Sequence, residues 1–233
     1  MFESSWPHNF MKHTLPALTP HHTSSALIAN GSIEDLASLA PSIKKHTRIV
    51  AVDRGLIYCQ QLGITPDLIV GDFDSVPPLL LEKYATVPTI TLPKEKDETD
   101  LEIALEHELQ ISQTVTLFGA LGARIDHTLT NLLIASRYPG RVVIETEREI
   151  VFALTGDVEI PVTVGQTISL VPINGPVIGI TTQGLQWELK NRTLDASFIG
   201  ISNVCLQTPV HVAIQQGILL CALSVNQNSN NHQ

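Results

Sequence analysis

Short apolar runs alternate with helical patterns over the first two thirds of the chain. The apolar runs cover residues 25–31, 48–53, 68–72, 89–92 and 115–120. The stretches between and after them carry apolar residues at helical spacing and cover residues 32–40, 54–63, 76–85, 99–109 and 124–137. Repetition of apolar strand, helix and apolar strand indicates a parallel sheet with helices on both faces.

Sequence signals mark where three of these helices begin or end. Ser32 and Asp35 have the spacing of a capping box, as do Thr99 and Glu102. Gly63 stands where a glycine would end the second helix. We therefore predict that one helix follows Ser32, that one ends at Gly63 and that one begins at Thr99.

The periodicity changes from about Glu149 onward. Short β-rich runs cover residues 148–154, 167–173, 177–183, 185–191, 210–216 and 217–225, with turn residues at 155–157, 174–176 and 216–217. Charged side chains are sparse in this part. We predict an α/β fold class, in which a parallel-sheet α/β domain at 25–148 is followed by a smaller antiparallel β-sandwich domain at 149–226.

The two ends of the chain have a different composition. Residues 1–24 carry His8, His13, His21 and His22 among prolines, serines and threonines. Four histidines could bind a transition metal, but a segment without helical or strand periodicity favours a flexible N-terminal arm. Residues 227–233 form a polar tail.

Composition and charge narrow the range of partners. The chain of 233 residues is 43% hydrophobic, which is enough for a substantial core, and its net charge is -9. An acidic chain disfavours nucleic acid and anionic membranes as partners, because both require a basic face. Three cysteines without metal-type spacing, and the lack of a long apolar run or a signal pattern, indicate a cytoplasmic location.

Aspartates follow the predicted strands at the point where each strand ends. The carboxyl ends of parallel strands meet at one edge of a sheet, so side chains that are scattered in sequence are expected to gather there. The aspartates concerned are Asp53, Asp72, Asp74, Asp97, Asp100 and Asp126. Such a group repels itself and predicts a hard cation with oxygen ligands, which means Mg²⁺.

A magnesium site on carboxylates commonly holds substrate phosphates. Lys94, Lys96 and Arg124 are interleaved with the aspartates and would suit an anion. GxxxxGK[ST] is absent, which argues against a P-loop, and GxGxxG is absent too. Taken one at a time, each aspartate is more often a helix cap or a turn residue than a ligand. The group as a whole favours a site without naming its reaction.

Three motifs, taken together, resemble one family. GDFDS at 71–75, KDETDLEIAL at 96–105 and GARIDHTLTN at 122–131 are similar to thiamine pyrophosphokinases. The resemblance continues through ISLVPI, GITTQGLQWEL and GISN and covers nearly all of residues 25–225. It implies a homodimer that transfers a diphosphate group from ATP to the hydroxyl of thiamine, with Mg²⁺, giving thiamine diphosphate and AMP.

The resemblance also implies roles for particular residues. Those that would hold Mg²⁺ and serve catalysis are Asp72, Asp74 and Asp100. Those that would bind ATP or build the polar wall around it are Asp53, Lys96, Asp97, Thr99, Arg124, Asp126 and Asn131. Those that would line the thiamine pocket are Leu185, Trp187, Ser202 and Asn203. Each thiamine is expected between the α/β domain of one subunit and the β domain of its partner. Trp187 could equally be a core residue.

Three positions depart from the family pattern, and two other functions stay open. Arg54 replaces a small residue, Ala123 a common glycine and Val204 a glutamate that bacterial members often have. An enzyme of related fold that diphosphorylates another alcohol, such as a hydroxymethylpterin, is one alternative. A non-catalytic nucleotide-binding module is the other. The DxD at 72–74 also suggests a phosphatase of the haloacid dehalogenase type, but DxDxT is absent.

Overall fold

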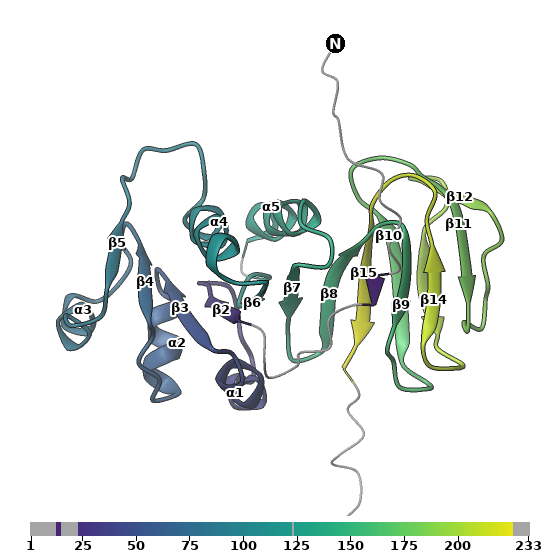
Figure 1. The fold of residues 1–233 in the computed structure, drawn as a ribbon. Coiled ribbons are helices and arrows are strands. Elements are labelled where there is room, and N and C mark those ends of the chain that lie inside the picture. The colour runs from purple at the N-terminus through teal and green to yellow at the C-terminus, as the bar shows by residue number, and fades with distance from the viewer. Residues whose placement is uncertain (1–12, 15–22, 123, 226–233) are drawn as a thin grey trace, which may run out of the picture.

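A computed structural model describes residues 13–14, 23–122 and 124–225. These residues form a ten-stranded sheet, a five-stranded sheet and five helices (Figure 1). The helices are α1 (Leu36–Lys44), α2 (Gly55–Gln61), α3 (Pro78–Lys83), α4 (Asp100–Ile111) and α5 (Ile125–Ser136). The predicted α/β fold class is confirmed. The predicted arm and tail lie largely outside the described residues; within the arm, His13–Thr14 form a short strand and Ser24 opens the first strand of the large sheet.

The ten-stranded sheet runs through both halves of the chain (Figure 1). In spatial order its strands are β13 (Gly200–Val204), β10 (Thr167–Pro172), β15 (Leu219–Ser224), β8 (Glu149–Leu154), β7 (Val142–Glu145), β6 (Thr114–Phe118), β2 (Ser24–Ile28), β3 (Arg48–Val52), β4 (Leu68–Gly71) and β5 (Thr89–Thr91). The strands from β7 to β5 are parallel, and pairing turns antiparallel at β7–β8. The turn at 146–148 falls at the predicted domain boundary, yet the sheet continues across it.

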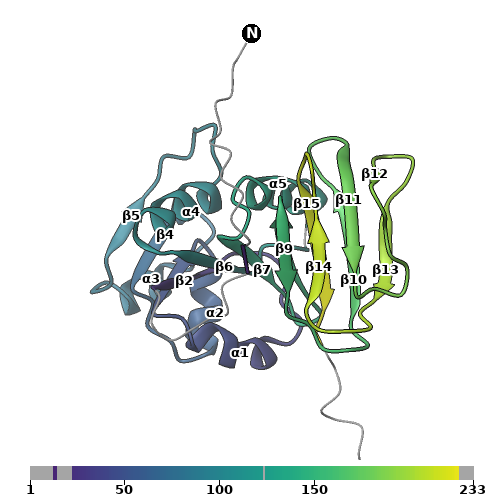
Figure 2. The same cartoon turned by 45° about the vertical axis from the view of Figure 1, so that its right-hand side comes forward.

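The five-stranded sheet packs on the antiparallel part of the large sheet (Figure 2). Its strands, in spatial order, are β1 (His13–Thr14), β9 (Asp157–Ile160), β14 (Val210–Ala213), β11 (Val177–Gln183) and β12 (Arg192–Leu194). Apolar side chains from both sheets form one core between them. This is the predicted antiparallel sandwich, with one of its two layers shared with the α/β part.

Alternation along the strands divides the core into layers. In β2, Leu27 faces α4 and α5, whereas Ala26 and Ile28 face α1, α2 and α3. In β8, Val151 contributes to the α4–α5 core and Phe152 to the sandwich core. Because side chains on a strand alternate between faces, one strand can serve two cores. The two halves of the molecule are therefore joined by a shared sheet as well as by the chain.

Of the three predicted helix ends, one is wrong and two are confirmed. The helix α1 is capped by Asp35, whose side chain accepts a hydrogen bond from Ser38 N at 3.1 Å, and Ser32 lies three residues before this cap. Glu147 accepts from the amides of residues 34 and 35, which keeps the chain out of the helix until that point. Thr99 caps α4 as predicted, and Gly63, at a φ of +64°, follows the end of α2.

The run at 185–191 was predicted as a strand and is a loop. Leu185 makes an isolated bridge to Cys205 and is buried in the sandwich core. The loop folds back on β11, where Thr182 exchanges hydrogen bonds with the amide and carbonyl groups of Leu189. Leu185 and Leu189 therefore reach the core without belonging to a strand, whereas Trp187 between them is exposed. The strands β7, β9, β12 and β13 had no counterpart in the prediction.

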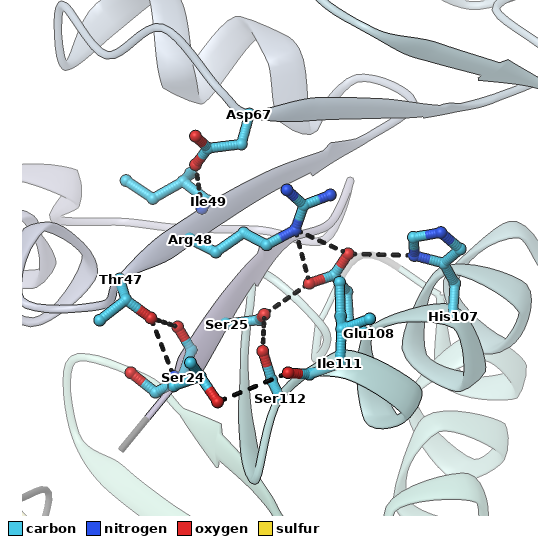
Figure 3. A network of polar contacts seen from close by, with 11 residues as sticks. Ser24, Ser25, Thr47, Arg48, Ile49, Asp67, His107, Glu108, Ile111 and Ser112 are labelled. Atoms are coloured by element: carbon cyan, nitrogen blue, oxygen red, sulfur yellow. Dashed lines mark hydrogen bonds and ion pairs between the residues drawn. The ribbon is translucent and has the colours of Figure 1, made fainter. Parts of the chain in front are cut away.

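A polar network lies at the amino ends of the parallel strands (Figure 3). The carboxylate of Glu108, on α4, is fully buried and accepts hydrogen bonds from Arg48 Nε at 3.0 and 3.1 Å and from Ser25 Oγ at 2.5 Å. Ser112 Oγ lies 2.7 Å from Ser25 Oγ, and His107 Nδ1 lies 3.1 Å from the same carboxylate. The network fastens the last turn of α4 to β2 and β3.

Candidate active site

The order of the parallel strands creates a crevice between β2 and β6. The chain proceeds from β2 outward through β3, β4 and β5, and then β6 returns to the other side of β2. Such a reversal separates the loops at the carboxyl ends of the two central strands, and ligands of open α/β sheets bind there. A cavity of about 220 Å³ occupies this position. This reversal of strand order between β2 and β6, called the switch point below, locates the candidate site. No single sequence motif does so.

Glycines allow the loops around this cavity to approach each other closely. Gly31 N donates to Gly119 O at 2.6 Å, and a Cβ on Gly31 would lie 2.3 Å from that oxygen. Gly119 and Gly122 have φ angles of +62° and +80°, a region that glycine occupies without strain. The prediction did not include Asn30 or Gly31, although an Asn-Gly pair after an apolar run is a turn signal.

Three carboxylates converge beside the cavity. Asp53 follows β3, Asp72 follows β4 and Asp100 is the first residue of α4. Each offers an oxygen, and these oxygens all lie within 4.8 Å of one another. A Cβ on Gly71 would lie 1.9 Å from Asp53 Oδ1, so the backbone of β4 makes room for this carboxylate. Two of the predicted magnesium ligands, Asp72 and Asp100, thus meet Asp53.

The backbone around this group is strained. Asp53 and Phe73 have φ angles of +48° and +62°. Non-glycine residues in this region cost about 1–3 kcal/mol each and persist where the surrounding structure holds them, often at functional sites. Asp53 N donates to Val70 O at 2.9 Å, which ties the strained residue to the neighbouring strand.

Burial and mutual repulsion shape the electrostatics of the three carboxylates. The pKa of Asp53 is raised to about 8, mainly by burial, then by its hydrogen bond with Asp100 and by the charges of Asp100 and Asp72. Asp53 Oδ1 is buried without a hydrogen-bond partner among the described residues. Lys96 Nζ lies 2.5 Å from Asp100 Oδ1 and is mostly buried. A buried oxygen without a donor, in an all-carboxylate group, fits a hard divalent cation.

Asp74 and Asp97 lie apart from this group. Asp74 is exposed and pairs with Lys94 at 3.3 Å, while its amide donates to Asp72 Oδ1 at 3.0 Å. Asp97 is exposed in the loop that leads to α4. The structure therefore brings Asp72 and Asp100 together but leaves Asp74 at the rim. Arg54 is exposed at the start of α2 and makes no side-chain capping contact.

Three of the remaining ATP-site candidates, Thr99, Arg124 and Asn131, line the cavity, and the fourth, Asp126, is paired with Arg124. Thr99 Oγ1 accepts from Glu102 N at 3.1 Å and caps α4. Asn131 is buried and donates to Ala120 O at 2.6 Å, so it orients the loop after β6. Arg124 and Asp126 form an exposed ion pair, which raises the pKa of Arg124 and lowers that of Asp126. Ala123, a predicted departure, lies outside the described residues.

The four thiamine-site candidates gather at the far edge of the large sheet. Asn203 Oδ1 accepts from Trp187 N at 3.1 Å, and its Nδ2 donates to Trp187 O at 2.7 Å, so Asn203 holds the Trp187 loop against β13. Trp187 is 57% exposed, whereas Leu185 is buried beneath it in the core. Ser202 is exposed, with a φ of +57°. Trp187 is therefore not the core residue that the sequence left open.

The two groups of candidates lie far apart within one chain. Six strands separate β3, which ends at Asp53, from β13, which carries Ser202 and Asn203. Seven steps of about 4.8 Å between neighbouring strands correspond to roughly 34 Å. The described helices include none that is long and apolar enough to cross a membrane.

Fold and site together define an α/β enzyme with an acidic centre at the switch point of its sheet. The family model for the thiamin pyrophosphokinase catalytic domain matches residues 39–144. The model for the thiamin pyrophosphokinase vitamin B1 binding domain matches residues 156–219. With both of its domain models matched over most of its length, the chain belongs to the thiamine pyrophosphokinase family.

Individual proteins agree with this assignment. Thiamine pyrophosphokinase 3 of Oryza sativa subsp. japonica is 29% identical over 181 residues, which cover 70% of this chain and 68% of that protein. The thiamine pyrophosphokinase of Bacillus subtilis is 27% identical over 212 residues, covering 86% and 98%. The crystal structure of thiamin pyrophosphokinase from Geobacillus thermodenitrificans has a TM-score of 0.76 at 25% identity, covering 88% of this chain and 99% of that one.

Proposed function

We propose that this member of the thiamine pyrophosphokinase family transfers the terminal diphosphate of ATP to the hydroxyl of thiamine, with Mg²⁺. The observation that carries the proposal is the convergence of Asp53, Asp72 and Asp100 beside a glycine-walled cavity at the switch point. A diphosphokinase for another alcohol, such as a hydroxymethylpterin, is less favoured, because the vitamin B1 binding model matches residues 156–219. A non-catalytic nucleotide-binding module would not require three clustered carboxylates on a strained backbone.

The residues present suit this chemistry. Mg²⁺ held by the three carboxylates would offset charge on the phosphoryl oxygens, where most of the catalysis of such transfers arises. Lys96 and Arg124 add positive charge, and the first turn of α4 turns backbone amides toward an anion. The thiamine oxygen forms a bond to the β-phosphorus as the bond from that phosphorus to the AMP oxygen breaks. The hydroxyl proton passes to a carboxylate, and AMP leaves.

Product analysis tests this proposal. Purified protein with Mg²⁺, ATP and thiamine is expected to form thiamine diphosphate and AMP in equal amounts, measured by chromatography. Formation of ADP as the nucleotide product would mean transfer of a single phosphoryl group and would contradict the proposal. Replacing thiamine by a hydroxymethylpterin provides the matched control and is expected to give no AMP.

We further infer that the enzyme works as a homodimer with shared active sites. The separation of roughly 34 Å between the two candidate groups argues against one chain building the site alone. Ile125, Leu129 and Leu133 form an exposed apolar stripe on α5, beside the carboxylate edge. The thiamine candidate Trp187 is exposed as well, and so are four apolar side chains close in sequence to Ser202 and Asn203, namely Phe198, Ile199, Ile201 and Leu206. Exposed apolar patches of this kind mark interaction sites.

Mixing two inactive variants tests the shared site. Asp72→Asn would disable the carboxylate group, and Ser202→Trp would block the thiamine candidates. With exchange of subunits, a shared-site heterodimer has one site with both lesions and one with neither, so part of the activity should return. Continued inactivity despite demonstrated exchange would contradict shared sites.

Three free, buried cysteines support a cytoplasmic location for this enzyme.

A further inference from the structure

The turn that follows β2 forms one wall of the candidate site. Its residues Ala29, Asn30 and Gly31 line the cavity of about 220 Å³. The amide of Gly31 is held by the loop after β6, because it donates to Gly119 O at 2.6 Å. The carbonyl oxygen of Gly31 has a different partner, since it accepts a hydrogen bond from the hydroxyl of Tyr58, on α2, at 2.8 Å. The backbone of Gly31 is thus fastened both to the loop after β6 and to α2.

Tyr58 reaches this turn because α2 begins directly against the end of β2. The first residue of α2 is Gly55, and a Cβ at this position would lie 1.8 Å from Ile28 O. A residue without a Cβ is therefore required for the helix to start so close to the strand. Tyr58 lies about one turn further along α2, and its ring packs on the core that α2 shares with β2 and β3. The half-buried ring keeps the hydroxyl at the turn.

The same helix is joined to one of the three clustered carboxylates. Asp53 lies just before α2, and its carbonyl oxygen accepts from Leu56 N, in the first turn of the helix, at 3.2 Å. Asp53 also lines the cavity and has the strained φ of +48°. The hydrogen bond from Tyr58 to Gly31 therefore connects the wall of the cavity to the segment that presents Asp53. Tyr58 itself is not among the described residues that line the cavity.

We propose that Tyr58 is a positioning residue, whose hydroxyl fixes the Asn30–Gly31 turn relative to Asp53 before ATP binds; the inference rests on the proposed diphosphate transfer from ATP. Tyr58 acts through the backbone of Gly31. A wall that is already in place spares the ligand the cost of ordering it. That cost is the same in the ground state and in the transition state. Loss of the hydroxyl should therefore weaken the binding of ATP and leave the turnover of the bound complex unchanged.

Tyr58→Phe tests the proposal, because it removes the hydroxyl and keeps the ring. Loss of one neutral hydrogen bond is expected to raise the KM for ATP about fivefold, with kcat within about twofold of wild type and the KM for thiamine unchanged. Calorimetric titration with ATP and Mg²⁺, without thiamine, should show a similar increase in the Kd for ATP. The titration does not depend on turnover, so it measures the positioning of the wall directly.

Tyr84→Phe is the matched control. The hydroxyl of Tyr84 donates to Ile64 O at 3.3 Å, and neither residue belongs to the described lining of the cavity. Both variants should lower the Tm, whereas only Tyr58→Phe should change the Kd for ATP. An unchanged Kd in Tyr58→Phe, an equal change in Tyr84→Phe, or a fall in kcat at unchanged KM would overturn the role of Tyr58. Wild-type protein that binds ATP but releases no AMP would instead contradict the proposed function, and the Kd values would still decide the role of Tyr58.

Discussion

The carboxylates at the two ends of the parallel sheet have opposite surroundings. At the amino end, Glu108 is fully buried and receives donors from Arg48 and Ser25 (Figure 3). At the carboxyl end, Asp53, Asp72 and Asp100 crowd together, and Lys96 is the cation that pairs with them in the described part of the chain.

The comparison separates a structural carboxylate from a functional one. A buried charge with a full set of donors is satisfied within the fold. A group of carboxylates with one lysine is not, and burial, followed by the hydrogen bond with Asp100 and the charges of Asp100 and Asp72, raises the pKa of Asp53. Burial of a carboxylate alone therefore does not identify a functional site. A shortage of hydrogen-bond donors around a group of carboxylates does identify one.

The largest expected effect is on catalysis at the carboxyl end. Asp72→Asn removes a charge without changing volume and is expected to lower kcat by about a thousandfold, since phosphoryl transfer depends on electrostatic stabilisation. Asp67→Asn is the matched control at the other end of β4. Asp67 accepts a hydrogen bond from Ile49 N, which an asparagine can also do, so activity should stay near wild type. Equal activities of the two variants would remove the distinction between the two ends.

The second largest expected effect is on the free energy of unfolding, through the network at the amino end of the parallel sheet. Glu108→Ala leaves Arg48 and Ser25 without their acceptor, and the free energy of unfolding should fall by about 3–5 kcal/mol. Glu108→Gln keeps an acceptor oxygen and should cost less. Urea denaturation measures both. A loss below about 1 kcal/mol for the alanine variant would mean that the network contributes little.

The strand–helix pattern predicted most of the α/β part but not the details of its site. Asp72 and Asp100 were placed correctly at one edge because strand ends meet there. Asp74 was expected with them, yet it pairs with Lys94, since two residues along an irregular turn need not share a direction. Asp53 was assigned to the wall rather than the centre, because its approach depends on the missing side chain of Gly71. The spacing of residues along the sequence gives no indication of close contacts of this kind.

The β part was harder to predict for a related reason. The loop at 185–191 has the apolar spacing of a strand, but hydrogen bonds to Thr182 fold it back on β11. The continuity of the large sheet across the domain boundary also depends on pairing between β7 and β8, which alternation in β8 allows but does not require.

A smaller expected effect is the loss of stability in acid, which arises from His46 at the amino end of the parallel sheet. Burial, and then the charge of Lys45, lower the pKa of His46 to about 4, and His46 Nδ1 lies 3.1 Å from Ser24 Oγ. The unfolded chain takes up a proton below about pH 6.5 while the folded one does not, so stability is lost as pH falls from 6.5 toward 4. His46→Gln should remove about 2 kcal/mol of that acid-induced loss, measured by urea unfolding at pH 7 and 4.5.

His127→Gln serves as the control for His46, because His127 is exposed at the start of α5. Its acid-induced loss should match that of wild type. If His46→Gln lost as much stability in acid as wild type does, the acid sensitivity would arise elsewhere in the molecule.

The most direct test of the cation site is thermal unfolding with and without Mg²⁺, in the absence of nucleotide. At about a hundred times its Kd, Mg²⁺ should stabilise wild-type protein by roughly 2–3 kcal/mol, because it binds the folded chain alone. Asp67→Asn should respond as wild type does. Asp72→Asn should lose most of the gain in Tm. Equal gains in all three proteins, or no gain in wild type, would contradict a cation site formed by Asp53, Asp72 and Asp100.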